Sequence, residues 1–138
     1  MNWKRVIVWS IIILVASSLI GLLSGFIMVQ SGIDPETIDQ KIRNYRLVRG
    51  VAVAIVAILC YWRLSAGALE RRGAHVAAAF VLVQIADMGT SLLFGAQAAE
   101  LVDPWGMLRG ALYALAGYVL ARLRPNNSFK PTPLRGAA

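Results

Sequence analysis

An uncharged apolar run near the beginning of the chain constrains the fold more than any other feature. Residues 6–30 contain no charged side chain. At a rise of about 1.5 Å per residue, a helix over this run exceeds the roughly 20 residues that cross a 30 Å hydrocarbon core. The sequence therefore predicts a membrane-spanning helix over this range.

Three more apolar segments follow. Residues 50–62 form a short run, and because the flanking Arg49 and Arg63 side chains can snorkel toward the interface, we expect residues 47–64 to span. The third segment, 75–96, contains Asp87, and the fourth, 104–123, contains Arg109. We predict an all-α polytopic membrane protein, with four transmembrane helices in an up-down bundle over residues 1–124.

The composition is typical of a chain whose solvent is lipid. Hydrophobic residues make up 58% and charged residues 15% of the chain, whereas soluble domains are about 45–50% apolar. The net charge of +7 would suggest a nucleic-acid partner in a soluble protein. Here the basic residues lie in short segments between apolar runs, so we expect them to contact the anionic head groups of a lipid bilayer, and we expect no nucleic acid.

Two Asp-Pro pairs predict the starts of helices. Asp34 and Asp103 each place a side-chain acceptor at the N-cap, and the proline that follows takes the first helical position, where its missing N–H costs nothing. Beyond the first pair, Ile38, Ile42 and Tyr45 share one face. This pattern fits either an amphipathic helix that lies on or leads into the membrane, or a solvated extension of the second spanning helix.

The distribution of basic residues predicts the orientation. If the N-terminus is cytoplasmic, the inside holds Lys4, Arg5, Arg63, Arg71, Arg72, Arg122, Arg124, Lys130 and Arg135. The outside then holds Lys41, Arg43, Arg46 and Arg49. Because cytoplasmic segments carry the excess of lysine and arginine, we predict that both termini are cytoplasmic.

The end of the chain differs in character from the rest. Residues 125–138 contain three prolines and no apolar periodicity, which predicts a disordered cytoplasmic tail. Residues 127–138, Asn-Ser-Phe-Lys-Pro-Thr-Pro-Leu-Arg-Gly-Ala-Ala, resemble the C-terminal peptide formed when a bacterial reading frame runs into the recombination site of an integron gene cassette. This resemblance covers about a tenth of the chain and implies a protein of the bacterial inner membrane.

Small residues recur at helical spacing in two segments. The first series is Ser17, Gly21 and Gly25, and the second is Gly106, Gly110 and Ala114, followed by Gly117 and Ala121. Such ridges let neighbouring helices approach closely enough for van der Waals packing to hold them. We interpret them as packing surfaces within the bundle, and the alternative is a homodimer seam that would make the protein a homo-oligomer.

Asp87 is the acid that needs an explanation. Gln84, Asp87 and Ser91 fall on one face, which must look into protein or water because a mid-membrane carboxylate is unfavourable unless paired or protonated. In the structural interpretation, Arg109 forms an ion pair with Asp87 and fixes the register of two helices. In the functional one, Asp87 exchanges a proton or binds a cation in a translocation path. Alternatively, the helix ends differ, or Arg109 snorkels outward.

The chemistry-bearing residues argue against an enzyme. With one histidine, His75, and one cysteine, Cys60, the usual metal sites and nucleophile sets cannot be built, so we expect no catalytic residue, metal or cofactor. We also expect His75 to lie at the cytoplasmic interface.

Three functional hypotheses remain. The first is a structural, interaction or accessory protein of the inner membrane, and the second is a small oligomeric proton-coupled transporter or channel that uses Asp87. The length and helix count are similar to those of the small multidrug exporters, but that family places its essential glutamate in the first helix, where residues 6–30 contain no acid. A holin-like pore former is the third.

Overall fold

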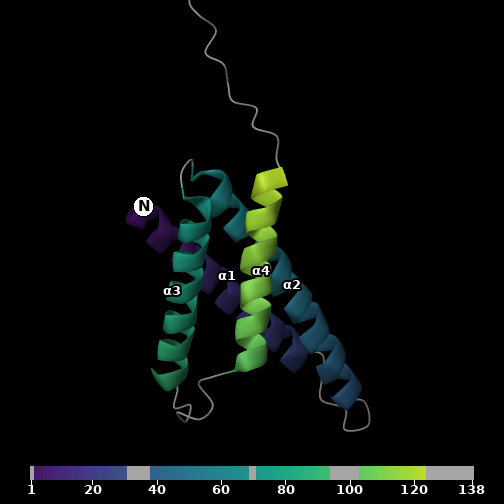
Figure 1. Ribbon diagram of the computed structural model, residues 1–138. Coiled ribbons are helices and arrows are strands. Elements are labelled where there is room, and N and C mark those ends of the chain that lie inside the picture. The colour runs from purple at the N-terminus through teal and green to yellow at the C-terminus, as the bar shows by residue number, and fades with distance from the viewer. Residues whose placement is uncertain (1, 31–37, 69–70, 94–102, 124–138) are drawn as a thin grey trace, which may run out of the picture.

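Four helices make up most of the chain that the structure describes. The computed structural model describes residues 2–30, 38–68, 71–93 and 103–123. Its helices are α1 (Trp3–Gln30), α2 (Ile38–Ala66), α3 (Arg72–Leu93) and α4 (Pro104–Leu123). Consecutive helices run in opposite directions (Figure 1). The all-α prediction is therefore confirmed, whereas residues 94–96 and the predicted tail lie outside the described residues.

The helix starts agree with local capping chemistry. At α1, the Asn2 side chain accepts a hydrogen bond of 3.2 Å from the Arg5 backbone N–H. At α4, Asp103 Oδ1 accepts one of 3.1 Å from the Trp105 backbone N–H. Each side chain satisfies an N–H group that has no partner within its own helix. The predicted start of the fourth helix is confirmed, and Asp34 lies outside the described residues.

The second helix is longer than the predicted span of 47–64. It is continuous from Ile38 to Ala66. Its first turns carry Ile42 and Tyr45 half-buried, with Asp39 and Arg43 exposed. The segment is therefore continuous with the second helix, which agrees both with a helix that leads into the membrane and with an extension of the second span.

Large apolar side chains cover the outside of the molecule. By length and composition, α1, α2 and α3 can each cross a membrane, and α4 is not among the helices of the described residues that meet this criterion. Leu22 is 71% exposed, Leu93 is 86% exposed, and α4 exposes Leu112 to 52%. Because soluble monomers rarely expose apolar surface of this extent, the three apolar helices suggest a membrane protein.

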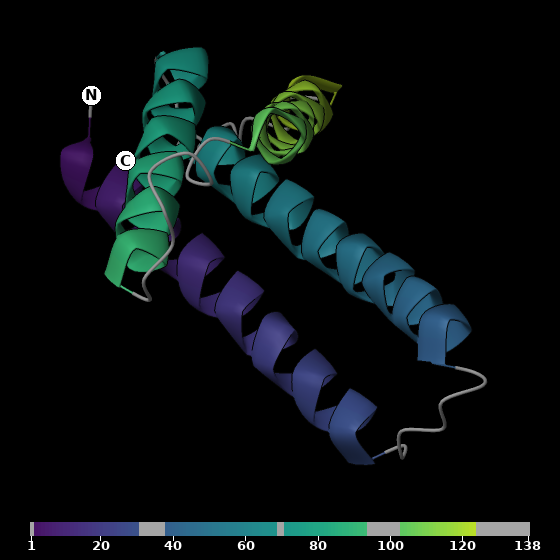
Figure 2. The same ribbon diagram turned by 90° about the horizontal axis from the view of Figure 1, so that it is seen from below.

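The two ends of the bundle differ. We call the end at which α1 and α3 begin and α2 and α4 finish the packed end, and the opposite one the open end. Toward the open end, α1 and α2 extend together away from α3 and α4 (Figure 2). α4 contacts α2 far more than α3, and α1 contacts both α2 and α3. The fourth helix therefore has the second, not the third, as its main neighbour.

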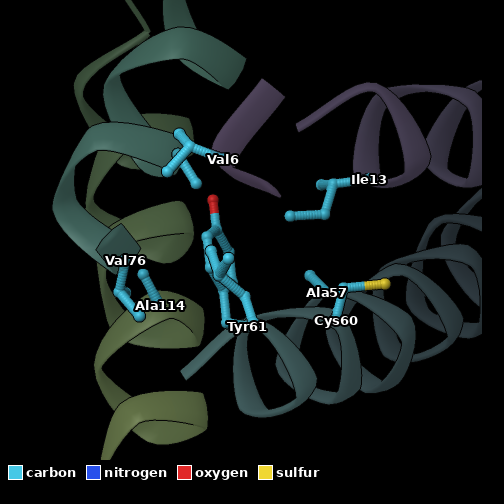
Figure 3. Close-up of a cluster of buried hydrophobic side chains, with 9 residues drawn as sticks. Val6, Ile13, Ala57, Cys60, Tyr61, Val76 and Ala114 are labelled. Carbon is cyan, nitrogen blue, oxygen red and sulfur yellow. The ribbon is translucent and has the colours of Figure 1, made fainter. Parts of the chain in front are cut away.

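The core lies at the packed end. It consists of Val6, Ile13, Ala57, Cys60, Tyr61, Leu64, Val76, Ala79 and Ala114. Tyr61 is 2% exposed, and its side chain points from α2 toward Val6 of α1 (Figure 3). Four of these residues are alanine or cysteine, so the helices approach closely without large side chains between them.

Hydrogen bonds from the beginning of α1 also hold the packed end together. Arg5 donates from Nη1 to the Gly67 carbonyl oxygen at 2.9 Å and from Nη2 to the Arg63 carbonyl oxygen at 3.2 Å. The Asn2 backbone N–H donates to Nε2 of His75 at 3.1 Å. Because Nε2 accepts, Nδ1 carries the proton and donates to the Arg71 carbonyl oxygen at 3.1 Å. His75 is thus buried between helices, in the first turn of α3.

Candidate functional site

A cavity of about 550 Å³ with both polar and apolar lining lies among the four helices, and every helix contributes to its wall. Its charged side chains are Arg46, Arg49, Asp87 and Arg109, and its uncharged polar side chains are Ser17, Tyr61, Gln84 and Tyr113. The core residues Ile13 and Tyr61 form one part of the wall, and Arg46 and Gly106 form another toward the open end. The cavity therefore extends from the core toward the open end.

The polar face of α3 lies partly on this cavity. Gln84 and Asp87 line it, and Ser91, half-buried one turn further on, does not. The Thr90 hydroxyl donates a hydrogen bond of 2.9 Å to the Asp87 carbonyl oxygen, so the hydrogen bond of this side chain stays within α3. The Asp87 residue is exposed within the single chain. Of the three residues on the predicted face, the structure thus brings two to the cavity.

The ion pair between Asp87 and Arg109, one of the interpretations that the sequence leaves open, differs from the pairing that the described side chains form. Arg109 Nη2 lies 3.7 Å from Asp103 Oδ2, and the two side chains are 62% and 61% exposed. Its Nε donates to the Trp105 carbonyl oxygen at 3.2 Å, along its own helix. Within the described residues, the ion-pair partner of Arg109 is therefore Asp103.

The packing of α4 explains this difference. The prediction assumed that helices joined by a short connection are also the closest neighbours in space. α4 packs more extensively on α2 than on α3, and it comes close to α3 at Gly110, beside Phe80 and Gln84. Asp103 is already within reach at the first turn of the same helix. Asp87 and Arg109 nonetheless line one cavity.

The second series of small residues lies at helix crossings. A Cβ at Gly117 would stand 2.6 Å from Cβ of Tyr61 and 2.8 Å from the Ile58 carbonyl oxygen, so the backbones of α4 and α2 nearly touch there. A Cβ at Gly110 would meet Phe80 and Gln84 of α3, each at 3.1 Å. Ala114 and Ala121 are buried. Gly106 differs, since its nearest neighbour is the Asp103 side chain.

The first series of small residues has a different surrounding. Ser17 lines the cavity. At Gly21, an added Cβ would lie 3.3 Å from Nη2 of Arg49, so the guanidinium occupies the space that the missing side chain leaves. Gly25 has nothing within 4 Å of such a Cβ. In the single chain, Arg49 packs against this series at Gly21, and no other described residue covers it at Gly25.

The sequence reasoning missed Arg46 and Arg49 as site residues. We counted them only as basic residues of an outer segment. Their spacing of three residues places them on one helix face, which Val53 and Ala57 continue toward the core. That shared face was the available indication that both arginines, although exposed, line one cavity. Tyr61 and Tyr113 were missed as well, and nothing in their local sequence distinguishes them from packing residues.

The donors in the cavity are mainly guanidinium groups. Within the four described ranges, no three His, Cys, Asp or Glu side chains gather as a metal site would require. Three arginines and one aspartate can bind an anion or hold a proton at the carboxylate. Comparison of the chain with protein-family models, with curated proteins and with solved structures found no match.

Proposed function

We propose that this chain is a four-span integral protein of the bacterial inner membrane, with both termini in the cytoplasm. The observation that carries the proposal is the exposure of large apolar side chains along all four helices. α4 joins the other three because its 20 residues suffice for a hydrocarbon core and its apolar side chains face outward. Its lower apolar content comes from Arg109 near one end and Arg122 near the other, positions from which arginine snorkels.

The proposed role is that of a structural or interaction protein, an accessory component that acts by contact rather than catalysis. The second half of α1 supports this role. It exposes Leu22, Phe26 and Val29 to more than half, and Gly25 between them is uncovered. A small residue flanked by large apolar ones on a spanning helix is a surface on which another helix packs.

Site-specific photo-crosslinking in intact cells tests this role. A photoreactive side chain at Gly25 is expected to yield a protein adduct of defined mass, because a second helix covers that position. The same group at Leu112, an exposed residue of α4, is expected to yield lipid adducts only. Equal protein crosslinking at both positions, or none at Gly25, would contradict the interaction role.

Reporter fusions test the topology separately from the role. Fusions after residues 2, 68 and 123 are expected to report the cytoplasmic side, and fusions within 31–37 and 94–102 the periplasmic side. A periplasmic result at residue 68, or termini on opposite sides, would contradict the four-span topology whatever the crosslinking gives.

A second candidate function is proton-coupled transport by an oligomer. The observation in its favour is that Asp87 lines the cavity while Arg109 pairs with Asp103. An acid in a polar cavity of a spanning bundle is the arrangement that proton relays use. In liposomes, Asp87→Asn is then expected to abolish proton flux, whereas Asp103→Asn, outside the cavity wall, leaves it. Flux that is absent from the unaltered protein, or unchanged by Asp87→Asn, excludes this candidate.

A further inference from the structure

We infer that the cavity binds an amphipathic anion, with a phosphate group held at Arg46, Arg49 and Arg109 and an apolar chain directed toward the core. The inference rests on the membrane placement proposed above, and it assigns a ligand class to the cavity. It goes beyond the accessory role because that role needs only the outer surface of α1.

The charge of the cavity wall favours an anion. Three guanidinium groups face one carboxylate, Asp87. Within the described ranges, no carboxylate lies within 4 Å of Arg46 or Arg49. Arg109 is paired with Asp103, but both side chains are more than 60% exposed, and ion pairs of that kind contribute little. Among the residues that the structure describes, the positive charge of the cavity wall therefore exceeds the negative charge.

Arginine is suited to the group that we assign. Its planar guanidinium presents several N–H donors that match two oxygens of a phosphate at once. The Arg46 and Arg49 side chains leave one face of α2 three residues apart, and Arg49 is seated against the gap at Gly21 of α1. Arg109 approaches from α4. Donors on two helices thus line the same cavity.

The wall changes in polarity along its length. Beyond the arginines, the lining toward the core is apolar, with Val53 and Ala57 from α2, Ile13 from α1 and Val83 from α3. Inorganic phosphate would leave this apolar part without a partner. A molecule that carries phosphate at one end and a hydrocarbon chain at the other would satisfy both parts.

The size of the cavity agrees with such an occupant. Its volume of about 550 Å³ lies within the roughly 300–1,000 Å³ of small-molecule sites. In the proposed orientation, the arginines lie toward the outer membrane interface, the depth at which phospholipid phosphates lie. Two sources share this chemistry: an anionic phospholipid of the bilayer and a soluble alkyl phosphate.

Lipid retention measures the binding. The protein is placed in nanodiscs with equal amounts of phosphatidylglycerol and phosphatidylcholine, and the lipids that stay bound are identified by native mass spectrometry. We expect the unaltered protein to retain the anionic lipid. Losing two charged hydrogen bonds in the double variant Arg46→Gln, Arg49→Gln is expected to lower that preference roughly tenfold or more.

Arg43→Gln is the matched control. Arg43 lies on the same helix, one turn before Arg46, is exposed and does not line the cavity. It removes one positive charge from the same end of the bundle, so a preference set by general surface charge would fall with it. If Arg43→Gln reduces retention as much per charge as the double variant does, the cavity is not the site and the inference is overturned.

A second series separates the two sources. Octyl phosphate and octyl glucoside are titrated into protein in phosphatidylcholine nanodiscs, with thermal unfolding as the measurement. Stabilisation by octyl phosphate that needs Arg46 and Arg49, together with retained phosphatidylglycerol, supports a lipid site. The same stabilisation without lipid retention supports a soluble anion in the same cavity. No difference between octyl phosphate and octyl glucoside, with no lipid preference, overturns the inference.

Folding and topology are checked apart from binding. The double variant Arg46→Lys, Arg49→Lys keeps the charge but loses the planar fork, so intermediate retention is expected from it. Circular dichroism of each variant confirms that the helices are intact. If the reporter fusions contradict four spans while octyl phosphate still binds through Arg46 and Arg49, the proposed topology fails and the ligand class stands.

Discussion

The packed end and the open end are built from the same four helices but held by different interactions. At the packed end, Val6, Leu64 and Ala79 are completely buried. Hydrogen bonds from the Arg5 side chain connect α1 to the C-terminal end of α2. At the open end, Leu93 is 86% exposed, and three arginines line the cavity with one carboxylate, Asp87. The difference indicates that one end carries the stability of the fold and leaves the other available for binding.

The contrast has a physical basis in how helices associate in lipid. Lipid chains are as apolar as leucine, so burying a leucine between helices gains little, whereas close contact between backbones gains dispersion energy. Ala79, Ala114 and Gly117 provide this contact at the packed end. Gly25, a small residue at the other end of α1, has no neighbour to contact. Small residues therefore stabilise only where a second helix is present.

Enlarging Gly117 should produce the largest effect. A side chain there meets Tyr61 and the backbone of α2 at 2.6–2.8 Å, and backbone atoms cannot move aside as a flexible side chain can. Gly117→Leu is expected to lower the free energy of unfolding by about 3 kcal/mol, because α4 must separate from α2. Thermal unfolding of the purified protein in detergent measures it.

Gly25→Leu is the control for this comparison. It adds the same side chain to a helix where nothing lies within 4 Å, so its effect on a single chain is expected to stay within about 0.5 kcal/mol. Equal losses of unfolding free energy from the two variants would show that the open end is packed as tightly as the packed end, and the contrast between the two ends would be wrong.

Removing the Arg5 side-chain hydrogen bonds should give a smaller loss. Arg5→Gln leaves the Arg63 and Gly67 carbonyl oxygens, at the C-terminal end of α2, without their side-chain donor. Charged hydrogen bonds contribute about 1.5–3 kcal/mol, and because these are exposed we expect about 1.5 kcal/mol. Lys4→Gln, one residue away and exposed, removes the same charge and should change little. A loss of equal size from Lys4→Gln would assign the effect to charge instead of to these bonds.

Local features of the fold were predictable, whereas the relations between helices were not. The four apolar segments and the N-cap at Asp103 depend on residues close together in the sequence, and the structure agrees with them. The partner of Arg109 and the position of Arg46 on the cavity wall depend on which helices cross and how each is rotated about its axis. Hydropathy and charge counts report depth in a membrane, but they do not report rotation. The candidate site was therefore found in part, through Gln84, Asp87 and Arg109, which all line the cavity.

The smallest expected effect is the coupling between charges at the open end. A double-mutant cycle of Asp103→Asn with Arg109→Gln is expected to give about 0.5 kcal/mol, as exposed ion pairs do, with thermal unfolding as the measurement. The cycle of Asp87→Asn with Arg109→Gln should give less, because the structure does not pair these residues. A larger coupling between Asp87 and Arg109 would mean that the open end closes around this pair in the membrane. The two ends would then differ less than described, and the arginine-lined cavity would lose one of its three cations.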